Sequence, residues 1–465
     1  MRNRLMTKFV RIVLVAAIIV SALTGCGVDK NGDTIDWTRN AVIYEVNVRQ
    51  YTEEGTFNAF SEHLQEIKDM GINTLWFMPI HPISETKRSG TLGSYYSVTD
   101  YCAVNPEFGT EEDFKALVEK AHDMGFKVML DWVANHTGWD CVWIEEHPEW
   151  YTQDGEGNII SPEGMGWLDV ADLNYDNQEM RVAMIECMRY WVEEYDIDGF
   201  RCDHAGGVPV DFWEEARVEL EKIKPLYMLA EDDVEISLLN SAFDFNYNCK
   251  LYEAMIAVAK DTKRANVLKY YIPDNYPEGT YTLNFLDNHD MNSYERTILE
   301  GFGADALPAM WSVIYTIPGT PLVYSGDEIA LDHNIAFMEK DTIDWESSDI
   351  SYRDLLAELS EIRSKNPALY AGAYGGDICY YDMDNKNVFA FSREKDGNIV
   401  ICLFNLSKRE QTIDVTEMFD ETETVLLYGK GAEVLNFEDH GITEENLSGE
   451  ITLQPWEFWI ASKEE

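Results

Sequence analysis

The chain has 465 residues, which is too long for one compact hydrophobic core and predicts a large domain with accessory parts. Its 85 acidic and 36 basic residues give a formal net charge of −49, which repels phosphate backbones and excludes nucleic acid as a partner. The eight cysteines include no CxxC pair, so their spacing predicts neither a zinc site nor a disulfide framework.

Residues 1–25 have the pattern of a secretory signal peptide. Basic residues precede an apolar run from Ile12 to Leu23 that is too short to span a membrane as a helix. The stretch that ends at Cys26 resembles a bacterial lipobox, which predicts lipidation of this thiol. Residues 26–35 form a polar tether, so we expect an extracytoplasmic protein held on a bacterial membrane by this lipid anchor only. An ordinary cleaved signal peptide is the alternative.

Helix and strand patterns alternate from about Asp36 onward. One apolar helical face runs from Phe57 to Ile67 and ends at Gly71, and a second helix begins with a capping box at Thr110 and Asp113. Short apolar runs between the helical stretches are typical of buried parallel strands. They lie at Ala41–Val48, Thr74–Phe77, Lys127–Val133, Gly199–Asp203, Tyr227–Glu231, Phe243–Tyr247, Tyr281–Leu286 and Pro321–Tyr324.

Eight such strands predict an α/β fold, a closed (β/α)8 TIM barrel over residues 36–133 and 173–371. Residues 134–172, rich in tryptophan, glycine and acids, form a short inserted domain. In residues 372–465 short β-branched and aromatic runs alternate with turn residues and no helical face separates them, which predicts a C-terminal antiparallel β-sandwich.

Carboxylates occur at or just past the ends of several predicted barrel strands. A TIM barrel keeps its active site at the carboxyl ends of its strands. One such acid alone is typical of a helix cap or a solvated loop, but four together, two with adjacent Asn-His pairs, favour a catalytic site. The four segments are Asp131–His136, Gly199–Asp203, Leu229–Glu231 and Phe285–Asp290.

In these four ordered segments the chain resembles glycoside hydrolase family 13, the α-amylase family. The resemblance implies a barrel with an inserted B domain and a C-terminal C domain. It also implies a retaining hydrolase in which Asp203 is the nucleophile, Glu231 the acid/base and Asp290 the third acid that holds the sugar hydroxyls. Two carboxyl groups about 5 Å apart suffice for this chemistry, and no cofactor is required for it.

The same resemblance assigns residues that bind the substrate. His136 and His289 would donate hydrogen bonds to the sugar, Tyr96 would stack under it, and Asp131 lies in the first segment. Arg201 lies on the same strand face as Asp203, two residues earlier, so we expect its cation to lower the pKa of that carboxyl. Glu231 must start protonated, which favours dry and negatively charged surroundings.

The chain departs from the family pattern after the nucleophile. Many α-amylases carry Lys-His three and four residues later, where this chain has Gly206 and Gly207. Those family residues shape the leaving-group subsites and help to hold a structural calcium ion. Asn135 is one candidate oxygen ligand, but calcium needs six to eight, so calcium stays an open question and no metal ligand is assigned.

The interpretation that follows is an α-amylase-type enzyme that cleaves α-1,4-glucosidic bonds of starch or maltodextrins. An exo-acting α-glucosidase, a cyclomaltodextrinase or a glucan transglycosylase is the alternative within enzymes. A glucan-binding lipoprotein without catalytic activity is the alternative from another class. The expected partner is an α-glucan, and a neutral polymer feels no net steering by the acidic surface.

Overall fold

The computed structural model describes residues 36–348, 350–416, 418, 424–430 and 449–463. The predicted signal peptide, Cys26 and the tether lie outside this part of the chain. Within it, no helix combines the length and the apolar character needed to cross a membrane.

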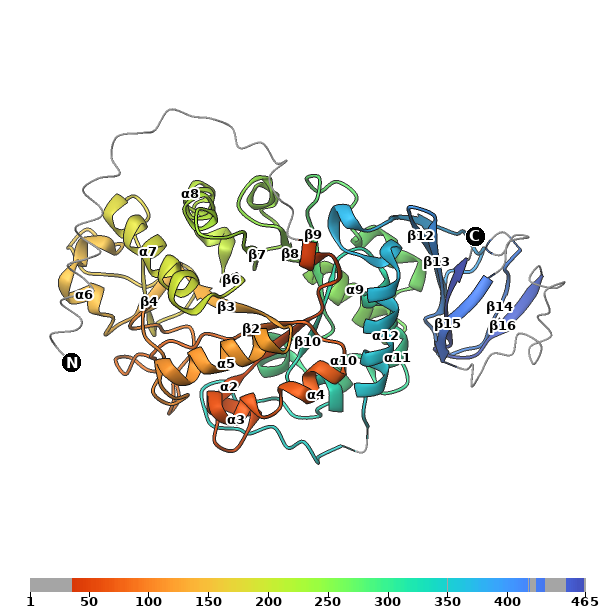
Figure 1. Cartoon of the computed structure of the whole chain (residues 1–465), viewed down its shortest axis with the longest axis horizontal. Coiled ribbons are helices and arrows are strands. Elements are labelled where there is room, and N and C mark those ends of the chain that lie inside the picture. Colours follow the sequence, from red (N-terminus) through yellow and green to blue (C-terminus); the bar gives the residue numbers. More distant parts are fainter. Residues whose placement is uncertain (1–35, 349, 417, 419–423, 431–448, 464–465) are drawn as a thin grey trace.

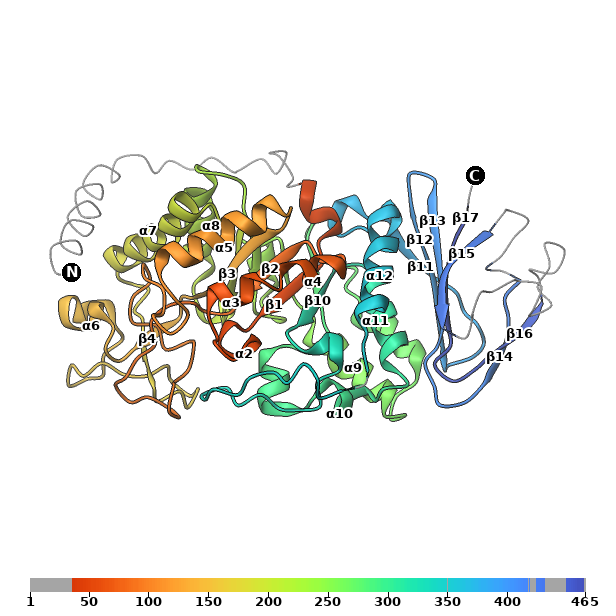
Figure 2. The ribbon, with the colours of Figure 1, turned by 60° about the horizontal axis from the view of Figure 1, so that its bottom comes forward.

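Eight parallel strands close into a barrel in the order β1-β10-β9-β8-β7-β6-β3-β2 (Figures 1 and 2). Each strand overlaps a range predicted from the sequence, so the predicted (β/α)8 barrel is confirmed. The strands are β1 (Ile43–Val46), β2 (Thr74–Phe77), β3 (Lys127–Val133), β6 (Gly199–Asp203), β7 (Tyr227–Ala230), β8 (Phe245–Tyr247), β9 (Tyr281–Asn284) and β10 (Thr320–Tyr324).

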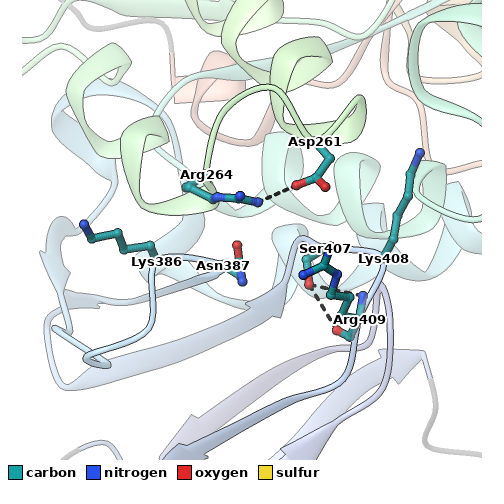
Figure 3. Close-up of a pocket in the computed structure, with 7 residues that line it drawn as sticks. All are labelled: Asp261, Arg264, Lys386, Asn387, Ser407, Lys408 and Arg409. Atoms are coloured by element: carbon teal, nitrogen blue, oxygen red, sulfur yellow. Dashed lines mark hydrogen bonds and ion pairs between the residues drawn. The ribbon is translucent and has the colours of Figure 1, made fainter.

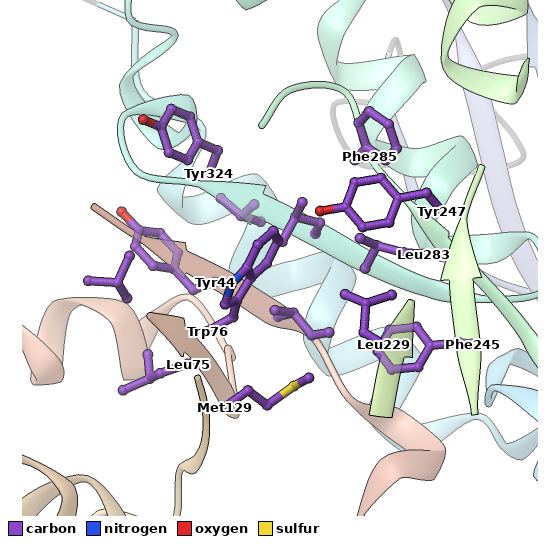
Figure 4. Packing of buried hydrophobic residues seen from close by; sticks show 14 of the residues in the cluster. Tyr44, Leu75, Trp76, Met129, Leu229, Phe245, Tyr247, Leu283, Phe285 and Tyr324 are labelled. Atoms are coloured by element: carbon purple, nitrogen blue, oxygen red, sulfur yellow. The ribbon is translucent and has the colours of Figure 1, made fainter. Parts of the chain in front are cut away.

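Helices surround the barrel, so the strands are buried on both faces, as parallel strands usually are. Figure 4 shows Trp76, Met129, Leu229, Phe245 and Leu283 packed among the strands, and each is fully buried. The helices are α2 (Val48–Tyr51), α3 (Phe57–Ser61), α4 (Leu64–Asp69), α5 (Glu111–Asp123), α7 (Gln178–Tyr195), α8 (Val210–Glu221), α9 (Cys249–Ala259), α10 (Ile298–Phe302), α11 (Leu307–Thr316) and α12 (Arg353–Lys365).

The first predicted helical face is split between two short helices, α3 and α4. The amides of Glu62 and His63 bond to carbonyls three residues back rather than four, which tightens the chain and interrupts the helix. The four residues of the predicted face are buried nonetheless: Phe57, Phe60, Leu64 and Ile67. The second helix is as predicted, because Thr110 and Asp113 form the capping box that starts α5.

The segment inserted after β3 contains a two-stranded antiparallel sheet, β4 (His136–Gly138) with β5 (Val170–Asp172), and the short helix α6 (Val142–Glu146). It lies at the opposite end of the molecule from the C-terminal sheets (Figures 1 and 2). Because β4 begins at His136, directly after the β3 segment, this insertion places its loops beside the carboxyl ends of the strands.

The C-terminal part is antiparallel, as predicted. A five-stranded sheet has the order β11-β12-β13-β17-β15, and β14 pairs with β16. The sequence missed β11 and β14, because neither is an apolar run and both leave residues exposed. The strands are β11 (Asp377–Tyr380), β12 (Val388–Lys395), β13 (Asn398–Asn405), β14 (Gln411–Asp414), β15 (Thr424–Lys430), β16 (Glu450–Leu453) and β17 (Phe458–Lys463).

A pocket of about 170 Å³ lies at the seam between the barrel and the C-terminal sheets (Figure 3). Arg264 and Asp261, which follow α9, form an ion pair on one side of it. Two turns of the C-terminal domain supply the other side. Its lining residues are Asp261, Arg264, Lys386, Asn387, Ser407, Lys408 and Arg409. None of the strand-end carboxylates lines this pocket, so the candidate catalytic residues lie elsewhere, at the carboxyl ends of the barrel strands.

Candidate active site

The barrel brings the strand-end acids together by its strand register. Asp131 on β3 lies opposite Arg201 on β6, and Val133 lies opposite Asp203. Cys202 on β6 pairs with Ala230 on β7, so the next residues, Asp203 and Glu231, end adjacent strands. Neighbouring strands are about 4.8 Å apart, which is close to the spacing of about 5 Å expected for two cooperating carboxyl groups.

A single buried arginine contacts three of these carboxylates. Nη1 of Arg201 lies 2.9 Å from Oδ1 of Asp131 and 3.0 Å from Oδ1 of Asp203. Nη2 lies 2.8 Å from Oε1 of Glu231. The Nε–H donates to the hydroxyl of Tyr247 on β8, at 3.2 Å. A fully buried cation with these contacts orients the carboxylates and offsets part of their charge.

The two central carboxyls differ in proton affinity. Burial raises the pKa of Asp203 to about 6, although the Arg201 cation opposes this shift. Burial raises the pKa of Glu231 to about 7; Arg201 again lowers it, and the charges of Asp203 and Asp290 raise it further. The expected lowering effect of Arg201 on the pKa of Asp203 is present, but desolvation outweighs it, so the net shift is upward. The expected negative surroundings of Glu231 are present, although its side chain is 26% exposed.

Tyr96 connects Asp131 of β3 to the histidine after β9. Its hydroxyl donates to Oδ2 of Asp131 at 3.0 Å and lies 2.9 Å from Nε2 of His289. Its ring stacks on the imidazole of His289, with centroids 5.5 Å apart, and on Phe337, at 6.1 Å. The predicted Tyr96, Asp131 and His289 thus form one network beside Asp203.

His289 is held by a carboxylate that sequence reasoning did not single out. Its Nδ1 contacts Oε1 of Glu45, a residue of β1 that is completely buried. Its Nε2 also lies 3.5 Å from Oδ2 of Asp290. Burial disfavours the imidazolium, but Asp290 and Glu45 outweigh it and raise the pKa of His289 to about 9. A glutamate inside a short apolar strand was the signal that could have identified Glu45.

His136 lies at the start of β4. The amide of Asn135 contacts its Nδ1 at 3.2 Å, and burial lowers the pKa of His136 to about 3, so the ring is neutral at physiological pH. The ring of Trp167, from the inserted segment, lies 5.4 Å from it. Neither Trp167 nor the buried Tyr247 had been predicted as part of the site.

The comparisons with known proteins identify the family of this barrel. A model of the alpha-amylase catalytic domain matches residues 28–158 and 165–354, which is more than half of the chain. The chain belongs to the alpha-amylase family. A solved alpha-amylase family structure, that of an alpha-amylase from Lactobacillus plantarum, is 29% identical, with a TM-score of 0.77 over 91% of this chain and 99% of that one.

Two further proteins are similar to this chain. A noncanonic maltogenic alpha-amylase, AmyB from Thermotoga neapolitana, is 28% identical, with a TM-score of 0.78 over 92% of this chain and 99% of that one. Alpha-amylase MalA from Haloarcula japonica is 24% identical over 432 residues, 89% of this chain and 62% of that protein. The chain spans less than two thirds of the length of the first curated relatives that it matches.

Asn135 is the candidate ligand for a structural calcium ion. In this alpha-amylase family chain, the part that the structure describes contains no group of three His, Cys, Asp or Glu side chains placed to hold a metal ion. A Cβ added at Gly207 would lie 2.8 Å from Oδ1 of Asn135 and 2.5 Å from Nε2 of His204, so an imidazole occupies the neighbouring space. Calcium takes six to eight oxygen ligands, among them backbone carbonyls, so calcium binding at Asn135 stays an open question.

Proposed function

We propose that the chain is a retaining α-glucan hydrolase that cleaves α-1,4-glucosidic bonds of starch or maltodextrins. The observation that carries this proposal is the contact of one buried arginine with both Asp203 and Glu231 at the ends of adjacent strands. The order of the two pKa values also supports it, because the acid must hold its proton at a pH where the nucleophile has lost its own. Relatives named alpha-amylase and maltogenic alpha-amylase favour this substrate class.

In the first step of the proposed mechanism, the Glu231 carboxyl donates its proton to the glycosidic oxygen. A carboxylate oxygen of Asp203 attacks the anomeric carbon from the opposite face, and the carbon–oxygen bond to the leaving sugar breaks. In the second step, ionised Glu231 takes a proton from water, whose oxygen attacks the anomeric carbon and releases Asp203. Two inversions leave the configuration unchanged, and both residues return to their starting states.

The remaining residues would bind and polarise the sugar that is transferred. Asp290 would accept hydrogen bonds from its hydroxyls, and a cationic His289 would donate to it. Tyr96 would provide an aromatic surface under the ring, and its hydroxyl is oriented by Asp131. The neutral ring of His136 would donate a hydrogen bond to the same sugar.

The pH dependence of kcat/KM tests the two assignments together. Below about pH 6 Asp203 is protonated and cannot attack, and above about pH 7 Glu231 has no proton to give. We expect a narrow bell-shaped profile with its maximum between these values. Because the two carboxyls interact, its two apparent pKa values describe the pair and not one residue each. Initial rates on maltotriose across the acidic and neutral range give the profile. A rate that is constant through both limbs would contradict the assignment.

Starch viscosity followed alongside reducing-end release tests the mode of action. A steep loss of viscosity at low reducing-end yield would support internal cleavage. Release of reducing ends with almost unchanged viscosity would favour the exo-acting, cyclodextrin-cleaving or transferring alternatives, for which the maltogenic relative is the specific support. Binding of glucan without any turnover would instead indicate a non-catalytic glucan-binding lipoprotein.

We also propose that the mature protein is extracytoplasmic and lipid-anchored at Cys26. The support is the basic and apolar leader followed by the lipobox-like sequence. Bacteria that express the full chain should incorporate labelled fatty acid into it, and a Cys26→Ala variant should take up none. Equal labelling of both proteins would contradict the anchor.

A further inference from the structure

The residue after the proposed nucleophile has an unusual backbone conformation. His204 has φ 44° and ψ 46°, in the left-handed region that non-glycine residues rarely adopt. Its backbone N–H donates to Oε2 of Glu231 at 2.7 Å. Strained residues at a functional site are retained where the surrounding structure requires them, so the placement of this imidazole calls for an explanation.

The two glycines that follow leave room for this side chain. A Cβ at Gly207 would lie 2.3 Å from Cδ2 and 2.5 Å from Nε2 of His204, which are distances that real Cβ atoms do not tolerate. A Cβ at Gly206 would lie 2.2 Å from Oδ2 of Asp232. Both glycines are exposed to solvent. The imidazole therefore occupies, at the open side of the site, space that a side chain at position 207 would fill.

The inserted segment supplies an aromatic partner for His204. The Trp167 ring lies 5.3 Å from the His204 ring at an interplanar angle of 83°, and it also contacts His136. Trp167 is only half-buried, and the neighbouring Leu168 is 73% exposed. An aromatic ring and an imidazole thus meet beside the exposed glycines at the mouth of the site.

The roles of Asp203 and Glu231 indicate on which side of the scissile bond His204 and Trp167 lie. The network of Tyr96, Asp131 and His289 lies beside Asp203, which bonds to the sugar being transferred. Glu231 must instead approach the glycosidic oxygen, which departs with the leaving group. The backbone N–H of His204 bonds to Glu231, so this residue lies next to the carboxyl that approaches the leaving group.

We propose that His204 and Trp167 bind the leaving-group glucosyl unit, and that His204 is a specificity-determining residue of this chain. This inference rests on the proposed function and adds a role for the residue next to the nucleophile. An indole face packs against the C–H groups of a pyranose ring, and an imidazole nitrogen bonds to a hydroxyl. By microscopic reversibility the same pair would bind a sugar acceptor in the second step and favour transfer over hydrolysis.

The test compares two substrates that differ in the leaving group. Maltotriose leaves a sugar, whereas α-maltosyl fluoride leaves fluoride and needs no site for it. The variant His204→Gly removes the imidazole and tolerates the left-handed backbone. We expect kcat/KM on maltotriose to fall about tenfold more than on the fluoride, which corresponds to about 1.4 kcal/mol, the loss of one hydrogen bond.

Two further variants separate binding from a structural role. His204→Asn, whose residue type also tolerates this backbone, should recover part of the discrimination. Gly207→Ala should reproduce the His204→Gly effect, because its methyl group displaces the ring. Val218→Ala, on the exposed face of α8, is the matched control and should leave kcat/KM on both substrates unchanged.

The possible outcomes are distinct. A selective loss on maltotriose, with a lower ratio of transfer to hydrolysis when maltose is added as acceptor, would support the inference. Equal losses on both substrates, or no loss on either, would overturn it while the proposed function stands. A wild-type protein that cleaves neither substrate would overturn the proposed function and this inference with it.

Discussion

An Asp203→Asn variant is expected to lose at least about 10³-fold of kcat on maltodextrin, because an amide oxygen cannot form the covalent glycosyl intermediate. The fold should persist, because asparagine has nearly the same size and keeps an oxygen for Nη1 of Arg201. The change removes a buried negative charge that Asp131 and Asp290 disfavour, so the melting temperature should fall little.

Three measurements check this expectation: the rate of reducing-end release, the thermal unfolding curve and the affinity for maltoheptaose. Asn substitution of the exposed Asp274 is the matched control and should retain full activity. Binding should survive in Asp203→Asn even though turnover is lost. Full activity of the Asp203→Asn variant would show that Asp203 is not the nucleophile.

Glu231→Gln should lose about 10²- to 10⁴-fold of kcat on maltodextrin, the usual contribution of a positioned acid or base. The loss should depend on the leaving group. With α-maltosyl fluoride the first step needs no proton from Glu231, so one equivalent of fluoride should appear in a rapid burst before slow hydrolysis. Azide, which attacks without a general base, should restore turnover. The alkaline limb of the pH profile near pH 7 should disappear.

Stopped-flow fluoride release and the pH profile of the variant give these results. Glu253→Gln, an exposed glutamate on α9, is the control. Equal losses on maltodextrin and on the fluoride, with no effect of azide, would show that Glu231 acts through the stability of the site and not as the acid/base.

The sequence predicted the barrel well because its signals are local. Each parallel strand is buried on both faces and is therefore a short continuous apolar run, as Thr74–Phe77 and Gly199–Asp203 are. The errors lie where local signals are weak. The apolar face from Phe57 to Ile67 did not show that the helix is interrupted at Glu62, and the half-exposed strand Asp377–Tyr380 has no apolar run.

The identity and order of the candidate acids could likewise be predicted, because each carboxylate follows a recognisable strand. Their proton affinities could not. The sequence places Arg201 on the strand face of Asp203 and so suggests a lowered pKa, but the depth of burial, which sets the larger effect, exists only in the closed barrel.

The order of strands, helices and strand-end carboxylates follows from the amino-acid sequence alone. Which distant residues meet at the site depends on how the chain folds. Glu45 contacts His289 across 244 positions, and Trp167 reaches His204 from the inserted segment. Strand propensity and helical periodicity act over a few residues, whereas these contacts depend on barrel closure and on the path of the insertion, and no local pattern encodes them.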